Sequence, residues 1–430
     1  MAVVGRDTDH FHRLALDYHR RARGKVKIAS KVSLQGRDDL SLAYTPGVAA
    51  PCREIAREPE LSFEYTARGN MVAVVSDGTA VLGLGDIGPE AAMPVMEGKA
   101  LLFKIFADVD AVPLCLGIRE VGALVDAVAA LEPTFGGINL EDISAPRCFE
   151  VEARLKRQVK VPVFHDDQHG TAIVSAAALL NAMQVVEKDL ESASVVINGA
   201  GAAGVATAYL VRDLGVENVI LCDSKGAIYE GRPYGMNPYK EKIARVTNPE
   251  GRQGTLEEVI RGADVFIGLS VAGAVTADMV RSMAPGAVIM AMANPIPEIY
   301  PEEALAAGAK VVCTGRSDYP NQINNVLAFP GVFRGALDVR ATDINDEMKL
   351  AAAKAIADLA ASNGLHPDSI IPEVWDRRVA PMVAVAVAGA AIETGVAQQP
   401  VPLQGLYDQT VARVEQVWES LSWQQRGNSE

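Results

Sequence analysis

Four carboxylates that follow two short apolar segments could bind a metal ion together. Residues 134–140 and 161–164 are apolar and are predicted to form short buried strands. The acids at their ends are Glu141, Asp142, Asp166 and Asp167. Because parallel strands deliver the residues at their tips to one edge of a sheet, the four acids are expected to meet there, where a hard cation such as Mg²⁺ or Mn²⁺ would relieve their repulsion. The alternative is that they are solvated acids in two separate loops.

A lysine in an apolar segment is a candidate general base. Lys99 precedes the apolar residues 101–103, and burial among them would lower its pKa toward the range that a base at neutral pH requires. The alternative is that its stem lies along apolar surface with the ammonium group in water. Tyr44 lies just before the turn at residues 46–47, and from the residues alone its phenol is expected to pack among apolar neighbours.

A glycine-rich segment predicts a dinucleotide-binding turn. Residues 193–198 are predicted as a strand and residues 205–214 as a helix, and the turn between them follows the pattern G-x-G-x-x-G. The residues of this turn are Gly199, Ala200, Gly201, Ala202, Ala203 and Gly204. In this context the glycines allow the tight bend, the approach of a pyrophosphate to the helix N-terminus and the packing of helix on strand. We therefore expect NAD or NADP to bind here.

The end of the next strand gives two opposed indications of cofactor preference. Asp223 ends the predicted strand at residues 218–223, where a carboxylate is expected to accept hydrogen bonds from the ribose hydroxyls of NAD. Ser224 and Lys225 follow at once, and a hydroxyl with an ammonium group could hold the 2′-phosphate of NADP. Both cofactors are therefore expected to work.

Further strands predict an α/β fold with a doubly wound parallel sheet. Apolar segments at 264–270, 287–292 and 310–314 alternate with helical stretches, as in a Rossmann-like domain. Two turns at or beyond strand tips carry the asparagines Asn294, Asn324 and Asn325. These side chains could reach a ligand in the crevice of the sheet, although asparagine is also an ordinary turn residue.

Other segments give local predictions. Residues 9–23 are predicted as a helix that docks on the body or on another subunit, and the Asp77-Gly78 pair between two apolar runs predicts a hairpin. Residues 348–362 and 372–396 are expected to be helices. The polar last thirty residues are expected to fray or to wrap around a neighbouring subunit.

Composition restricts the class of protein. The chain has 430 residues, of which 49% are hydrophobic, and a formal net charge of −14, which argues against nucleic acid or a membrane surface as partner. The five scattered cysteines form no C-x-x-C pair and indicate reduced thiols of a cytoplasmic protein. Charged residues interrupt the N-terminus, and the longest apolar run, 381–392, is too short to span a bilayer, so neither a signal peptide nor a membrane anchor is expected.

Several of these motifs together resemble those of malic enzymes in their short bacterial form. The resemblance covers roughly residues 30 to 395 in the family's order. The matching segments are residues 42–48, 77–85, 97–99, 138–143, 165–171 and 324–326. It implies oxidative decarboxylation of (S)-malate to pyruvate and CO₂ with NAD or NADP and a divalent metal, in a homodimer or a larger homo-oligomer.

The resemblance also implies roles for particular residues. Glu141, Asp142 and Asp167 resemble the metal ligands of the family, Lys99 its base and Tyr44 its acid. Lys99 would take the hydroxyl proton of malate while hydride leaves C2 for the nicotinamide, and Tyr44 would protonate C3 of the enolate that remains after loss of CO₂. The substrate is also expected to contact Lys99 and three asparagines: Asn294, Asn324 and Asn325. Asn294 is expected to contact the dinucleotide as well.

One departure from the family concerns the second carboxylate of the substrate. Longer malic enzymes carry an arginine where this chain has Ala80, which leaves three other arginines or a second subunit as the source of the cation. The three candidates are Arg68, Arg119 and Arg316. Two other classes of protein combine similar parts. One is a dehydrogenase that acts on another 2-hydroxy acid or on an amino acid, and the chemistry of an amino-acid dehydrogenase needs no metal. The other is a non-catalytic dinucleotide sensor.

The motifs also predict how the chain divides into domains. Residues 1–165, completed by residues 325–430, are expected to form an α/β substrate and metal domain, and residues 166–324 a nucleotide domain. Asp167 would then lie at the hinge, so that closure of the domains assembles the metal site.

Overall fold

The computed structural model describes residues 8–427 and contains two β-sheets. The strands of the first sheet, in spatial order, are β2 (Asp110–Cys115), β1 (Met71–Ser76), β3 (Gly137–Leu140) and β4 (Val163–His165). All neighbouring strands in this sheet are parallel. Leu140 pairs with His165, so β3 and β4 end at the same edge of the sheet.

The second sheet is doubly wound, as predicted. Its strands, in spatial order, are β10 (Val311–Thr314), β9 (Val288–Ala291), β8 (Val265–Gly268), β5 (Ser194–Asn198), β6 (Asn218–Asp223) and β7 (Gly226–Ala227). Only the short β7 runs antiparallel to its neighbour. The strand order reverses at β5, which has β6 on one side and β8 on the other, and this reversal opens a crevice at the carboxyl ends of the strands. The helices of this region are α9 (Ala202–Asp213), α10 (Pro238–Ala244), α11 (Leu256–Val259), α12 (Ala277–Arg281) and α13 (Pro301–Ala306).

Helices cover both faces of the first sheet. Alternate residues of β1 point to opposite sides: Val72 and Val74 pack with the core that includes α5 (Pro89–Ala107), while Ala73 and Val75 pack with α6 (Val121–Ala129) and α7 (Arg147–Gln158). The long, largely buried helix α8 (Asp166–Val185) starts directly after β4 and leads to the second sheet.

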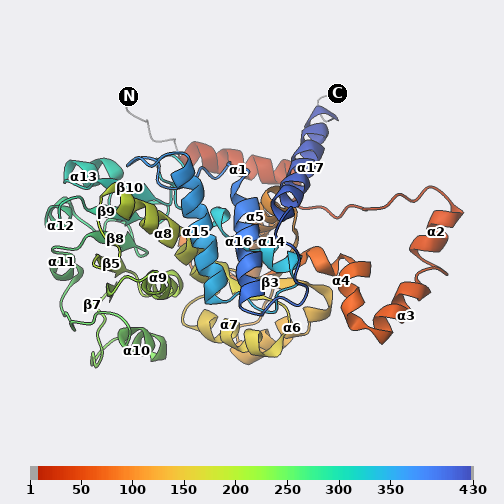
Figure 1. Ribbon diagram of the computed structural model, residues 1–430, viewed down its shortest axis with the longest axis horizontal. Coiled ribbons are helices and arrows are strands. Elements are labelled where there is room, and N and C mark those ends of the chain that lie inside the picture. The colour runs from red at the N-terminus through yellow and green to blue at the C-terminus, as the bar shows by residue number, and fades with distance from the viewer. Residues whose placement is uncertain (1–7, 428–430) are drawn as a thin grey trace.

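After β10 the chain returns to the first sheet and completes its core. The returning helices are α14 (Phe329–Asp338), α15 (Asp346–Ser362), α16 (Val379–Glu393) and α17 (Leu406–Gly427). α14 packs on α5 and α16, and α15 packs on α8 (Figure 1). The ring of Phe103 in α5 lies 4.7 Å from the ring of Phe329 and 5.3 Å from that of Phe333. The predicted helices at 348–362 and 372–396 correspond to α15 and α16.

The structure corrects two local predictions. Over the described part the last residues do not fray, because α17 packs on α5 and α16 and the ring centre of its Trp418 lies 6.4 Å from that of Trp375. The alternative, that these residues wrap around a neighbouring subunit, stays a prediction. The Asp77-Gly78 pair does not close a hairpin: β1 pairs in parallel with β2 and β3, and after Asp77 the chain forms a loop with a 3₁₀ turn at Leu82–Leu84. Further 3₁₀ turns are Pro59–Leu61, Ala67–Asn70, Glu132–Thr134 and Asn325–Leu327.

An N-terminal segment projects from the body. It carries α2 (Arg37–Ala43) and α3 (Ala49–Arg57), and Figure 1 shows both helices far from α5, with α4 (Ser62–Tyr65) at their base. Neither α2 nor α3 has a buried residue, and the apolar side chains of Leu42 and Tyr44 are 77% and 67% exposed. We call residues 24–58 the arm. The helix α1 (Thr8–Ala22), which precedes the arm, forms as predicted for residues 9–23, but its apolar side chains Phe11, Leu14 and Leu16 are exposed, so docking on the body or on another subunit stays a prediction.

No helix among residues 8–427 is both long and apolar enough to cross a bilayer.

Candidate active site

The four acids meet at one edge of the first sheet because β3 and β4 are adjacent and parallel. Glu141 and Asp142 follow β3, while Asp166 and Asp167 form the first turn of α8 after β4. Glu141, Asp142 and Asp166 are at most 5% exposed. The alternative of two separate solvated loops is therefore wrong.

Three of the acids form a cluster with the geometry of a cation site. Glu141, Asp142 and Asp167 each offer an oxygen, and these oxygens all lie within 4.8 Å of one another. Asp167 Oδ2 also accepts a hydrogen bond from the backbone N–H of Asp142 at 2.7 Å, which ties the α8 side of the cluster to the β3 side. Burial, reinforced by the charges of its acidic neighbours, raises the pKa of Glu141 well above its usual value despite Lys99. An all-oxygen, crowded anionic set of this kind fits Mg²⁺ or Mn²⁺.

The fourth acid binds the candidate base. Lys99 Nζ in α5 lies 2.5 Å from Asp166 Oδ2 and 2.9 Å from Glu141 Oε1, and 4.1 Å from the centre of the Phe329 ring. Its side chain is 11% exposed, so the ammonium group does not reach for water. Burial lowers the pKa of Lys99, but Asp166 and Glu141 outweigh burial and raise the pKa above its ordinary value. The predicted lowering of this pKa was wrong because it left out the paired acids.

Tyr44 does not lie near Lys99 within one chain. It follows α2 on the arm, whereas Lys99 lies in α5 within the body (Figure 1). The expectation that the phenol packs among apolar neighbours is wrong for this chain alone, since the side chain is 67% exposed.

The predicted asparagines have different surroundings. Asn325 Nδ2 donates to Asp166 Oδ2 at 3.0 Å, next to Lys99. The Asn324 side chain instead caps a 3₁₀ turn, since its Oδ1 accepts the backbone N–H of Val326. Asn294 follows β9, and a Cβ at Gly83 would lie 3.0 Å from its carbonyl oxygen, so Asn294 lies where the first-sheet loop meets the second sheet.

The glycine turn has the predicted construction. Gly199 has φ +120°, and a Cβ there would meet the carbonyl of Leu269, while a Cβ at Gly204 would meet the carbonyl of Gly199. A Cβ at Gly201 would meet nothing within 4 Å, and Gly201 caps α9 without a side-chain hydrogen bond. The backbone in front of α9 is thus open to a pyrophosphate.

The sequence did not predict the partners of Asp223. Arg232 donates to both of its oxygens, at 2.9 and 2.5 Å, and Lys240 Nζ lies 2.6 Å from Oδ2. Burial raises the pKa of Asp223, but Arg232, Lys240 and the N–H of Lys225 outweigh burial and lower the pKa to about 2. Arg232 and Lys240 follow Asp223 closely in the sequence, and two cations so near an acid in the chain are a signal for an ion pair. Ser224 and Lys225 are exposed beside the carboxylate.

The three candidate arginines have partners of their own. Arg68 stacks on Phe63 at 4.1 Å from the ring centre, and Arg119 pairs with Asp86. Arg316 pairs with Asp318 and donates to the carbonyl of Pro295 at 3.0 Å, which places it beside the Asn294 turn.

Comparison with known protein families finds a match for each half of the chain. The model described as "Malic enzyme, N-terminal domain" matches residues 23–120 and 118–156, and that described as "Malic enzyme, NAD binding domain" matches residues 168–392. The bifunctional malic/malolactic enzyme of Bacillus subtilis is 59% identical over 396 residues, which are 92% of this chain and 97% of that protein. The NADP-dependent malic enzyme of Rhizobium meliloti is 52% identical over 416 residues, which are 93% of this chain and 54% of that longer protein. The solved structure of an NAD-dependent malic enzyme from Thermotoga maritima has 51% identity, covers 87% of this chain and 99% of its own, and has a TM-score of 0.84.

Proposed function

The chain belongs to the malic enzyme family, and on that premise we propose that it converts (S)-malate to pyruvate and CO₂ while reducing NAD or NADP. The observation that carries the proposal is a cluster of three carboxylates within 4.8 Å beside a buried lysine. The open glycine turn of the second sheet supplies the place for the dinucleotide.

We propose that Glu141, Asp142 and Asp167 hold Mg²⁺ or Mn²⁺. When bound, the cation supplies positive charge that stabilises the negative charge developing on the C2 oxygen of the substrate. The three ligands come from the ends of β3 and β4, so the rigid sheet positions the cluster.

Lys99 is proposed as the general base that takes the proton of the C2 hydroxyl. For this role its pKa must fall, and neutralising the charge of Glu141, one of its two acidic partners, acts in that direction. Asn325, which donates to the other partner, holds Asp166 in place. Asn294, Asn324 and Asn325 remain proposed contacts of the bound substrate, and Arg316 is the candidate for its second carboxylate because it lies beside the Asn294 turn.

Tyr44 is proposed as the acid that protonates C3, supplied by a second copy of the chain. Its phenol is exposed on a projecting arm, and the arm exposes further apolar side chains, among them Ile28, Val32, Leu34 and Leu42. Exposed apolar surface of this kind is typical of a surface that another subunit covers. The working unit is then a homodimer or a multiple of one, in which each arm completes the partner's site.

The proposed cofactor site spans the glycine turn and the strand tip. Residues 199–204 would hold the pyrophosphate, and Asp223, Ser224 and Lys225 would face the adenosine ribose. Because Arg232 and Lys240 neutralise Asp223, a 2′-phosphate is not repelled there. This favours the use of NADP as well as NAD.

We further propose that residues 1–165 and 325–430 form the substrate domain and residues 166–324 the nucleotide domain. α8 starts at Asp166, so Asp167 would lie at the hinge and closure would bring the nicotinamide to the metal site. All five cysteines are free thiols, which supports work in the reducing cytoplasm.

The experiment is an assay of malate with NAD or NADP, with a chelator and then with Mn²⁺. Reduced nicotinamide and pyruvate should form in equal amounts, cease with the chelator and return with Mn²⁺. Asp167→Asn should lose this metal-dependent activity, whereas Asp189→Asn, an exposed acid beyond α8, should retain it. Oxaloacetate as the final product, or activity that resists the chelator, would contradict the proposal.

A second activity is favoured by the 59% identity to a malic/malolactic enzyme. If reduced nicotinamide returned its hydride to C2 of pyruvate, malate would become lactate and CO₂ without net consumption of cofactor. Lactate formed from malate with catalytic amounts of NAD would establish this activity, and pyruvate as the only product would exclude it.

A further inference from the structure

We propose that Glu152 of α7 is a positioning residue that holds the first turn of α8 and so aims Asp167 at the cation cluster. The inference deepens the proposed function and rests on its assignment of Asp167 as a ligand. Glu152 belongs to none of the sequence motifs and is not part of the acid cluster itself.

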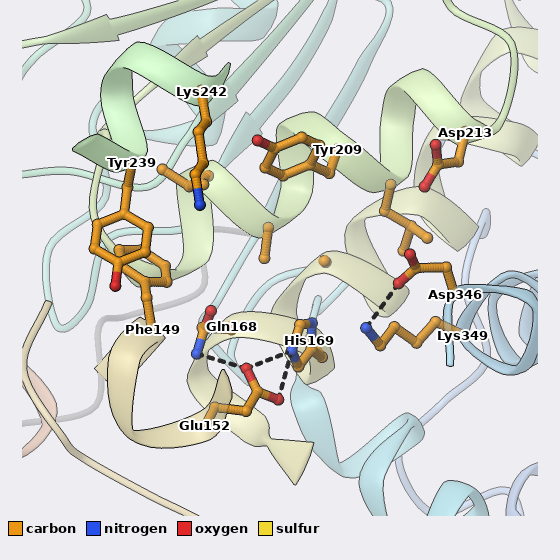
Figure 2. A pocket seen from close by; sticks show the side chains of 14 residues that line it. Phe149, Glu152, Gln168, His169, Tyr209, Asp213, Tyr239, Lys242, Asp346 and Lys349 are labelled. Carbon is orange, nitrogen blue, oxygen red and sulfur yellow. Dashed lines mark hydrogen bonds and ion pairs between the residues drawn. The ribbon is translucent and has the colours of Figure 1, made fainter. Parts of the chain in front are cut away.

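Glu152 lies in a cleft of about 400 Å³ whose lining includes none of the three clustered acids. The cleft is lined by residues of α7, α8, α9, α10 and α15 (Figure 2). The Glu152 side chain is 8% exposed, and both of its oxygens accept hydrogen bonds from α8. Gln168 Nε2 donates at 3.1 Å, and His169 Nε2 lies 2.8 and 3.0 Å from the two oxygens.

The two residues that Glu152 holds follow Asp167 directly in the same helical turn. The N-cap residue of α8, His165, makes no side-chain capping bond. Side chains of other elements contact this turn: Lys99 and Asn325 bind Asp166, and Glu152 binds the two residues after Asp167. On the cluster side, Asp167 accepts the N–H of Asp142 at 2.7 Å. On the cleft side, Glu152 is the anchor. Because residues of one helical turn move together, a shift of Gln168 and His169 displaces the Asp167 carboxylate.

The chemistry of Glu152 fits an anchor better than a packing residue. Its helix neighbours Cys148, Val151 and Leu155 are buried and apolar, so an apolar side chain would pack there without the cost of burying a charge. Burial raises the pKa of Glu152, but His169, Lys156 and Lys349 outweigh burial and hold the pKa below its usual range. The group is therefore a carboxylate at neutral pH, and a carboxylate is the stronger acceptor for the two α8 donors.

The test measures the affinity of the whole protein for Mn²⁺, without malate or dinucleotide, from the electron paramagnetic resonance signal of free Mn²⁺. Glu152→Ala should weaken Mn²⁺ binding about 10-fold or more, a loss typical for groups that orient metal ligands. Glu152→Gln keeps the volume and one acceptor, so it should lie between Glu152→Ala and the wild type. Glu150→Gln is the matched control, because Glu150 lies on the same helix with a side chain 52% exposed, and it should leave the affinity unchanged.

Two companion measurements separate positioning from general stability. The affinity for reduced nicotinamide, read by its fluorescence, and the thermal midpoint should match the wild type in Glu152→Gln. A parallel fall of all three quantities would indicate a merely structural role and overturn the inference. Wild-type Mn²⁺ affinity in both Glu152 variants would overturn it as well.

A double-mutant cycle tests whether Glu152 acts through Asp167. Asp167→Asn should itself weaken Mn²⁺ binding, and adding Glu152→Gln should then cause no further loss, because the oriented ligand is already gone. Additive losses would overturn the inference and leave the proposed ligands intact. Wild-type affinity in Asp167→Asn would overturn the ligand assignment itself, and the inference with it.

Discussion

Arg232 holds both oxygens of the Asp223 carboxylate, at 2.9 and 2.5 Å, with its guanidinium group fully buried. The acid that ends β6 is therefore neutralised from within the protein, with Lys240 as its second cation at 2.6 Å. An acid at this place usually selects NAD by accepting ribose hydroxyls and repelling a 2′-phosphate. Here one carboxylate and two cations leave the ribose site with a net positive charge, so we expect NADP to bind as well as NAD.

Lys240→Ala and Lys225→Ala should each raise the Michaelis constant for NADP about 10-fold and spare NAD, because one charge-assisted hydrogen bond to the phosphate is worth about 1.5–3 kcal/mol. Asp223→Ala should act in the opposite direction, since it removes the ribose acceptor and frees two cations. Lys242→Ala is the control, as Lys242 lies on the same helix but lines the cleft. Steady-state kinetics with both cofactors measure the effect, and equal changes for NAD and NADP would show that this turn does not read the 2′ position.

Tyr44 and Lys99 should affect different steps. Tyr44→Phe should block protonation of the enolate and leave hydride transfer less affected, whereas Lys99→Ala should damage both the redox and the proton steps. Each loss should be about 10²–10⁴-fold, the usual contribution of general acid–base catalysis. Two assays with added oxaloacetate separate the two steps: its reduction reports hydride transfer, and its decarboxylation to pyruvate reports protonation of the enolate. Wild-type turnover in Tyr44→Phe would assign the phenol to packing.

Mixed dimers should reveal which subunit supplies Tyr44. In a dimer of one Tyr44→Phe chain and one Lys99→Ala chain, exchange of arms puts both intact residues into one of the two sites. Co-expression with two affinity tags should therefore restore up to about half of the wild-type activity, because one site of two is complete. If each chain used its own Tyr44, both sites would lack one group, and the mixed dimer would be as inactive as its parents.

The sequence predicted those parts of the site that depend on strand tips. Glu141 and Asp167 follow strands that the apolar pattern identifies, and the ends of adjacent parallel strands must converge. The pairing of Lys99 with Asp166 was not predictable in this way, because it depends on how α5 packs against the sheet. Arg232 lies in an irregular segment after β7, and Glu152 on an amphipathic helix resembles an ordinary surface charge. The sequence around these two residues therefore has no pattern that predicts their buried partners.

The wrong prediction of a hairpin at Asp77-Gly78 has a similar cause. Asp77-Gly78 has the composition of a two-residue turn, but Asp77 is fully buried and its carboxylate pairs with Arg147 at 2.9 Å. The distant arginine makes an acid acceptable inside the protein, and local turn preference cannot register such a partner. Long-range pairing also explains why the raised pKa of Lys99 was not foreseen.

Asp110 should contribute stability that disappears in acid. Burial raises its pKa, but hydrogen bonds from Lys31, Asn70 and Lys104 outweigh burial and bring the pKa to about 2. Since the folded-state pKa lies below the ordinary value of 3.8, the contribution is complete above that value and is lost as the pH falls toward 2. Asp110→Asn should cost about 1–2 kcal/mol at pH 7, from 1.36 kcal/mol per pKa unit reduced for the screening of a partly exposed group by solvent.

Denaturant unfolding of Asp110→Asn and wild type between pH 7 and pH 3 checks this prediction. The difference in unfolding free energy should stay constant down to about pH 5 and shrink below pH 4. Asp126→Asn, which changes an exposed acid of α6, should show no such difference at any pH. A difference between Asp110→Asn and wild type that persists unchanged at pH 3 would show that the ion pairs are not its source.

Glu298 should control cofactor affinity through the two loops that it joins. Its carboxylate is fully buried and accepts the N–H of Ser270 after β8 at 3.0 Å and the N–H of Ala293 after β9 at 2.9 Å, next to Asn294. In Glu298→Gln one acceptor becomes a donor that faces an N–H, so one loop is released and a buried donor is left unpaired, at a cost of about 1–3 kcal/mol. We expect the affinity for reduced nicotinamide, measured by its fluorescence, to fall about 10-fold, while Mn²⁺ affinity stays at the wild-type value because the cation cluster lies on the other sheet. Glu303→Gln on the exposed face of α13 should change neither quantity, and an unchanged nicotinamide affinity in Glu298→Gln would show that these loops hold their shape without the buried carboxylate.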